Sequence, residues 1–340
     1  MYLSLHPYAT WNAADWLIMI SMSLTKLSGE AVIFFFVLSG FSIAHSLTAQ
    51  PSPKIFLQKR FIRLYPTYIF GFILALLSVL LLKTNYDLFL SGKYATPIFD
   101  KFKNSLVLFD WRIIVKTLLY QPELGTVITP YWSLVYEVIF YICAIFFVKD
   151  LITYYRISLL MFISGIVLEI FHVNFIEKSI LLKFVFQYNF YFMVGIYLYN
   201  NYEKVKAITF FNFRYWPLLL LSFYIIMIGV ESRIGERIHL SFIIAALTCV
   251  YMIIRFLDEN IEFKLLQHVG KFSYTLYIVH FSVITFLLWF IYVVLQWQPP
   301  YIYNYFVWIP AVFICVGVSY LAYLVVEKPT QRLLSRLRKR

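Results

Sequence analysis

Charged residues and cysteines are both scarce in this sequence. Only 14% of the 340 residues are charged, whereas 62% are hydrophobic. A soluble domain is ~45–50% apolar and ~25% charged, so a water-soluble fold is excluded because no core could bury this much apolar surface. The same composition excludes intrinsic disorder. The apolar surface must therefore face lipid.

The three cysteines carry no signal for a disulfide or a metal. Cys143, Cys249 and Cys315 lie inside apolar stretches, and none has CxxC spacing. Neither a disulfide framework nor a zinc site is indicated by such a pattern. We expect the three to be small buried side chains, and we expect no bound metal.

Nine segments are apolar over roughly the ~20 residues that a membrane-spanning helix needs. They must be helices, because open sheet edges do not persist in hydrocarbon. We predict an all-α, polytopic transmembrane bundle that forms a single membrane domain over residues 1–340, with no appended soluble domain. The predicted spans are 30–48, 64–82, 131–148, 156–172, 180–200, 213–230, 238–256, 272–296 and 303–326.

Lys and Arg are distributed unevenly between the two sides of this bundle. The net charge of +12 would suggest nucleic acid in a soluble protein, but here the cations lie in short loops, so we predict no nucleic-acid partner. Of the 29 Lys and Arg, 18 fall on the side that includes the tail after Val326. The positive-inside rule makes that side, and hence the C-terminus, cytoplasmic. The loops on this side are 49–63, 149–156, 201–214 and 255–271.

The other side has two unusual features. Counting back through nine spans from a cytoplasmic C-terminus puts Met1 outside, although no signal peptide precedes it. We therefore expect that most of a first helix is missing, either because the chain is short at its N-terminus or because its start codon is placed too late. The long loop 83–130 contains Phe102 to Tyr120, where apolar and charged residues alternate at near-helical spacing. This spacing predicts an amphipathic helix at the outer membrane interface.

Two polar clusters lie in the first predicted spans, where a charged group costs at least ~2.5–3.5 kcal/mol at mid-membrane. In the segment from Gly29 to His45, Ser39 and Gly40 allow close packing of a second helix, or close approach of a ligand. In the segment FLQKRFIRLYPTY, the three cations Lys59, Arg60 and Arg63 lie within about one helical turn. They either anchor the helix at the cytoplasmic face or bind phosphate groups such as those of coenzyme A.

Two further clusters place polar residues at helical spacing. Ser133 and Glu137 share one helix face with Tyr141, and a buried carboxylate such as Glu137 needs a partner or a shifted pKa. Neighbouring Trp132 is also a typical interface aromatic. In the segment GKFSYTLYIVH, the side chains of Ser273, Tyr277 and His280 again share one face.

Six short segments occur in an order that resembles the acyltransferase-3 family of integral-membrane O-acyltransferases. They are 34–47, 56–66, 131–141, 190–199, 270–280 and 325–329. The resemblance implies ten transmembrane helices in a cell (plasma) membrane and transfer of an acyl group, commonly acetyl, from cytoplasmic acyl-CoA to a hydroxyl. The acceptor in this family is commonly a cell-surface or exported glycan.

The resemblance also implies roles for individual residues. The family's first helix carries an Arg, ten further residues and then a His, and the match for that His is His6, with the Arg falling before Met1. We expect His6 to be the general base, since imidazole titrates near neutral pH, and His280 is the alternative. Lys59, Arg60 and Arg63 would bind the phosphates of CoA, and Glu137 and Ser133 would orient a base or the acceptor. Ser39 and Tyr277 would donate hydrogen bonds. Trp132 and Ser273 would contact the substrate. Direct transfer and a covalent acyl-His or acyl-Ser step both stay open.

Two other classes of protein compete with this enzyme. A transporter could use Glu137, His280 and Arg63 along a substrate pathway, but it predicts paired broken helices in two related halves, which the sequence does not show. A structural subunit would not need polar residues in its spans. We therefore favour the enzyme, with acyl-CoA as co-substrate and no permanently bound cofactor, and leave its oligomeric state open.

Overall fold

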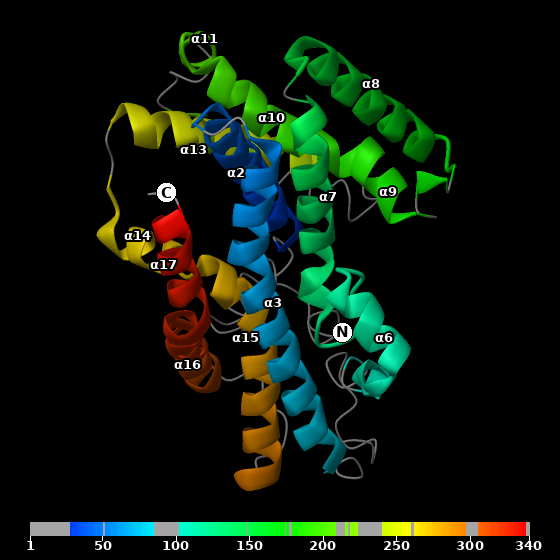
Figure 1. The fold of residues 1–340 in the computed structure, drawn as a ribbon, viewed down its shortest axis with the longest axis vertical. Coiled ribbons are helices and arrows are strands. Elements are labelled where there is room, and N and C mark those ends of the chain that lie inside the picture. Colours follow the sequence, from blue (N-terminus) through cyan, green and yellow to red (C-terminus); the bar gives the residue numbers. More distant parts are fainter. Residues whose placement is uncertain are drawn as a thin grey trace, which may run out of the picture. The chain divides into compact units, whose positions relative to one another are not determined.

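Every regular element described by the computed structural model is a helix (Figure 1). Seven helices among the described residues are long and apolar enough to cross a membrane, and Ser273–Trp289 is a shorter apolar helix. This confirms the predicted all-α polytopic fold. The structure describes residues 28–49, 52–84, 101, 103–147, 149–173, 175–176, 179–208, 215–216, 218–223, 240–259, 262–296 and 305–337.

The described helices follow eight of the nine predicted spans, and the ninth, 213–230, lies largely outside the described residues. The largest difference is α3, Pro53–Thr84, which begins 11 residues before the predicted span at 64. Proline suits the first turn of a helix because its missing N–H has no intrahelical partner there. The basic cluster therefore lies within α3 itself, in its second and third turns.

The single amphipathic helix predicted over Phe102 to Tyr120 is wrong in its extent. The segment contains a 3₁₀ helix, η3 (Ser105–Phe109), and then α6 (Trp111–Leu118). Asp110 separates them because its side chain accepts a hydrogen bond from the Arg112 backbone N–H at 2.8 Å and so caps α6.

The chain folds into two compact units, and residues 1–53 and 139–262 form the first. Within it, α2 packs against α10 and α13, and α8 packs against α10 and the π-helical segment η6. The helices of this unit are α2 (Ser28–Ala49), the later turns of α7 (Trp132–Phe147), α8 (Leu151–Ile170), α9 (Ile180–Lys183), η6 (Phe184–Tyr188), α10 (Asn189–Asn200), α11 (Tyr202–Lys206) and α13 (Leu240–Asp258).

Glycine allows α2 and α10 to touch backbone to backbone. A Cβ added at Gly40 would lie 2.1 Å from the Phe192 carbonyl oxygen, and one added at Gly195 would lie 2.1 Å from that of Val37. Helix association in lipid depends on such close packing, since lipid tails are as apolar as the side chains. Small-residue packing therefore accounts for Gly40 in the motif around Ser39.

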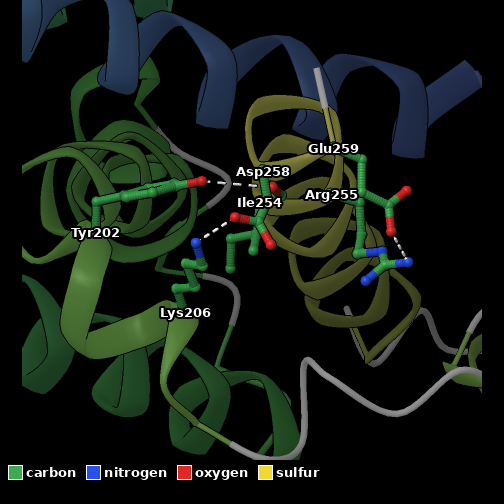
Figure 2. A network of polar contacts seen from close by, with 6 residues as sticks. All are labelled: Tyr202, Lys206, Ile254, Arg255, Asp258 and Glu259. Atoms are coloured by element: carbon green, nitrogen blue, oxygen red, sulfur yellow. Dashed lines mark hydrogen bonds and ion pairs between the residues drawn. The ribbon is translucent and has the colours of Figure 1, made fainter. Parts of the chain in front are cut away.

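Polar contacts join α11 to the end of α13 (Figure 2). The Tyr202 hydroxyl donates to the Ile254 carbonyl at 3.4 Å, and the Lys206 ammonium forms an ion pair with Asp258. Hydrogen bonding to Asp258 raises the pKa of Lys206. These contacts fix a short polar helix to a membrane span.

The second unit comprises residues 54–138 and 263–340. In this unit α15 packs on α16, and α17 packs on the π-helical segment η10. Its helices are α3, η3, α6, η4 (Thr129–Tyr131), the first turns of α7, α14 (Lys264–Gly270), α15 (Ser273–Trp289), η8 (Phe290–Val294), α16 (Tyr305–Ala322), η10 (Tyr323–Glu327) and α17 (Lys328–Leu337).

Candidate functional site

Helix α15 organises the polar groups of the second unit. The Tyr274 hydroxyl donates to the Leu64 carbonyl of α3 at 3.0 Å, and the Tyr131 hydroxyl donates to the Ile278 carbonyl of α15 at 3.3 Å. A Cβ at Gly71 would lie 2.0 Å from a methyl carbon of Ile278. Helix α15 is therefore held by tyrosine hydrogen bonds and by a glycine contact.

The structure brings together two of the predicted site residues, which are 144 positions apart in the sequence. The Ser133 and Tyr277 hydroxyl oxygens lie 2.7 Å apart, and the Tyr277 hydroxyl also contacts the Pro130 carbonyl. Because a carbonyl oxygen can only accept, Tyr277 donates to Pro130 and accepts from Ser133. These two protons therefore tie α15 to the start of α7.

His280 lies one turn further along α15 and is half-buried. Its Nδ1 is 2.7 Å from the Tyr277 carbonyl oxygen and 3.2 Å from that of Leu276. Both partners accept only, so Nδ1 carries the proton of the neutral ring and Nε2 carries the lone pair. In the part of the chain that the structure describes, nothing hydrogen-bonds to Nε2. His280 is thus in the tautomer that a general base needs.

A cavity of about 450 Å³ lies between α15 and α16, with His280 in its wall. Ser273 and Tyr277 also line it, so the structure confirms that the three predicted residues share one face. Ser273 donates its hydroxyl proton to the Gly270 carbonyl at 3.0 Å. The other lining residues are Leu276, Ile284, Ala311, Val312, Cys315 and Val316.

Glu137 is buried in α7, with 4% of its surface exposed. Its carboxylate lies close enough to act electrostatically on the phenols of Tyr120 and Tyr277. Burial raises the pKa of Tyr120, and the charge of Glu137 raises it further. Tyr120 adopts a left-handed backbone with φ of 59° and packs its ring 4.4 Å from that of Tyr68. The carboxylate therefore lies near the phenol groups of two tyrosines.

The three predicted phosphate-binding cations differ in their surroundings. Lys59 and Arg60 are half-buried, and the Arg60 guanidinium lies 5.4 Å from the centre of the Phe56 ring. Arg63 is exposed, and its charge acts on the carboxylate of Glu327. The exposed Arg63 is the cation best placed to meet a ligand.

Glu327 is a buried polar residue that the sequence interpretation left without a role. Its side chain is 1% exposed, and its carboxylate accepts from Thr275 at 2.5 Å and from Gln331 at 3.0 Å. It ends the π-helical segment η10, and such segments occur frequently at functional sites. The signal was an acidic residue in an apolar stretch, the same signal that singled out Glu137.

Of the remaining predicted residues, one belongs to the other compact unit, one has an aromatic neighbour, and one lies outside the described residues. Ser39 is buried in α2 of the first unit, and Trp132 packs its ring 5.8 Å from that of Tyr136. His6 lies outside the described residues. Among the residues that are described, no three His, Cys, Asp or Glu side chains come close enough to hold a metal ion.

These helices and side chains define a multi-pass membrane protein with a polar site inside its apolar helices. A family model described as "Acyltransferase domain" matches residues 1–327, so the chain belongs to that acyltransferase-3 family and the predicted resemblance is confirmed. The match covers both compact units. No curated protein and no solved structure matches the chain.

Proposed function

We propose that this membrane acyltransferase moves an acyl group, acetyl being the simplest, from cytoplasmic acyl-CoA to a hydroxyl of a cell-surface or exported glycan. Family membership supports acyl transfer and favours an enzyme over a transporter. The observation that carries the proposal is His280, whose side chain lines a cavity between two membrane helices and whose Nδ1–H donates to a backbone carbonyl, which leaves the ring's lone pair on Nε2.

The reaction needs a base for the hydroxyl proton and a path for the leaving thiolate. In our proposal Nε2 of His280 takes the proton while the acceptor oxygen attacks the thioester carbonyl carbon. The tetrahedral intermediate then expels the CoA sulfur, and the imidazolium returns its proton to that sulfur. The net change is one new ester bond, one broken thioester bond and one free thiol.

The other groups act by position and charge. Ser133 and Tyr277 hold α15 against α7, and Glu137 acts electrostatically on the Tyr277 phenol, which lies one turn before His280. Arg63, with Lys59 and Arg60 in the same helix, would bind CoA phosphates, because the guanidinium fork matches phosphate oxygens. In our proposal the first turns of α3, and the C-terminus, lie on the cytoplasmic side of the plasma membrane, which the distribution of Lys and Arg supports.

A labelled acetyl-CoA assay with membranes tests the choice of base. We expect His280→Ala to lower the transfer rate ~10²–10⁴-fold, the usual contribution of a general base. His268→Ala, an exposed histidine of α14, is the matched control and should keep full activity. Full activity in His280→Ala together with loss in His6→Ala would assign the base to His6 instead.

A second assay tests donor binding. Arg63→Ala should raise the KM for acyl-CoA at least tenfold and change kcat little, because a lost phosphate contact weakens ground-state binding. Arg156→Ala, another cation of the predicted cytoplasmic side, is the control. An unchanged KM in Arg63→Ala would remove that residue from the CoA site.

A further inference from the structure

The cavity between α15 and α16 is almost wholly apolar, although a reactive group lies in its wall. Six of the nine described residues that line it have no charged or amide group and no hydroxyl. Of the three polar ones, Ser273 and Tyr277 have already committed their protons to the backbone carbonyls of Gly270 and Pro130. His280 is the remaining polar residue among the described residues that line the cavity.

Such a wall discriminates between the two substrates of an acyl transfer. A glycan carries many hydroxyls, and burying them without hydrogen bonds costs free energy for each one. An acyl chain has only its carbonyl to satisfy, and its methylenes gain from leaving water. The acyl chain therefore fits this cavity, and the glycan does not.

The size of the cavity exceeds what acetyl needs. An apolar cavity of ~150 Å³ can hold benzene, which has six carbons. At about 450 Å³ this cavity has three times that volume. The wall also extends along α15 from Ser273 to Ile284, which is about 16 Å at ~1.5 Å per residue.

We propose that this cavity binds the acyl chain of the donor and admits linear chains longer than acetyl. The inference rests on the proposed function and adds its donor specificity. The thioester carbonyl lies at His280, and the chain extends along α16 past Ala311 and Val316. Each added methylene should raise kcat/KM by up to about fourfold until the cavity is full.

The test compares acetyl-, butyryl- and hexanoyl-CoA with the full-length protein in membranes. We expect wild type to prefer hexanoyl-CoA to acetyl-CoA in kcat/KM. Val316→Phe fills the cavity and should lower the hexanoyl-to-acetyl ratio at least tenfold. The matched control is Val318→Phe, the same change at an exposed position of α16 that does not line the cavity, and it should leave the ratio unchanged.

Ala311→Leu provides an independent filling variant if Val316→Phe does not fold, and it should shift the ratio in the same direction. Transfer from acetyl-CoA alone in wild type, or an unchanged ratio in both filling variants, would overturn this inference and leave the proposed function intact. A higher KM for the acceptor alone would assign the cavity to the acceptor and overturn it too. No transfer from any acyl-CoA would refute the proposed function itself.

Discussion

Removing the hydrogen bond between Glu327 and Thr275 should destabilise the second unit by an amount that a double-mutant cycle can isolate. The Thr275 side chain is fully buried, and its hydroxyl donates to the carboxylate at 2.5 Å. A hydrogen bond to a charged group contributes ~1.5–3 kcal/mol. Glu327→Ala also removes the free-energy cost of burying the carboxylate. That contribution cancels in the cycle, because it is the same whether Glu327→Ala is made in wild type or in the Thr275 variant.

We therefore expect a coupling energy of about 1.5–3 kcal/mol between Glu327→Ala and Thr275→Val. The double variant should be destabilised by less than the sum of the single variants. The assay is equilibrium unfolding in mixed lipid–detergent micelles titrated with a denaturing detergent, followed by circular dichroism, for wild type, both single variants and the double variant.

Thr330 offers an internal control for the same cycle. Its hydroxyl donates to the backbone carbonyl of Glu327 at 2.7 Å, and this carbonyl persists in Glu327→Ala. Thr330→Val should therefore couple to Glu327→Ala by less than ~0.5 kcal/mol. Equal coupling energies for Thr275 and Thr330, or a value below ~0.5 kcal/mol for Thr275, would refute the assigned hydrogen bond.

Two further predictions concern the first unit and use the same unfolding assay or a thermal melt. Gly40→Ala should lower the free energy of unfolding by ~1–3 kcal/mol or more, because the new Cβ would lie 2.1 Å from the Phe192 carbonyl oxygen. The control is Gly317→Ala, whose new Cβ would meet nothing within 4 Å and which should be neutral or slightly stabilising. Equal effects of the two substitutions would contradict the close contact between α2 and α10. Asp150 has a lowered pKa because it is hydrogen-bonded first to the Thr153 side chain and then to the Thr153 backbone N–H, which lies 3.1 Å away. The stability that its charge provides is therefore present above ~3.9, the usual pKa of Asp, and is lost as the pH falls through the lowered value. Asp150→Ala should lower the melting temperature at pH 7, and its difference from wild type should shrink below about pH 4. Asp150→Asn keeps the helix cap, so its melting temperature should differ less from that of wild type. A difference for Asp150→Ala that does not change with pH would show that the carboxylate charge is not the source of the stability.

The helices were predictable from the sequence because lipid imposes a simple rule. A backbone in hydrocarbon must satisfy its own hydrogen bonds, so each long apolar segment becomes a helix, and α2, α8 and α13 lie close to their predicted positions. The rule is weaker at helix ends in water. Pro53 starts α3 early, and Asp110 divides the expected amphipathic helix, because local capping decides such boundaries.

The residues of the site were also partly predictable, since a polar side chain in a span needs a reason. That rule singled out Ser133, Glu137, Tyr277 and His280. It could not say which atoms meet, because the partners of several hydrogen bonds here are separated by 52 to 210 positions in the sequence. The hydrogen bond from Thr275 to Glu327 depends on how α15 and η10 meet in the fold, which the sequence of neither helix encodes alone.

The hydrogen bonds that the hydroxyl groups around α15 donate help to decide between direct acyl transfer and a covalent acyl-serine intermediate. A covalent acyl-serine would need a serine hydroxyl beside the base, yet the serine in the cavity wall, Ser273, donates to the backbone carbonyl of Gly270 at the end of α14. The Ser133 proton is engaged with Tyr277. Neither hydroxyl is free for His280 to deprotonate without first breaking a bond that holds α15. A hydroxyl brought by the acceptor meets no such obstacle, so this arrangement of donors favours direct transfer from the thioester to the acceptor over a serine-linked intermediate.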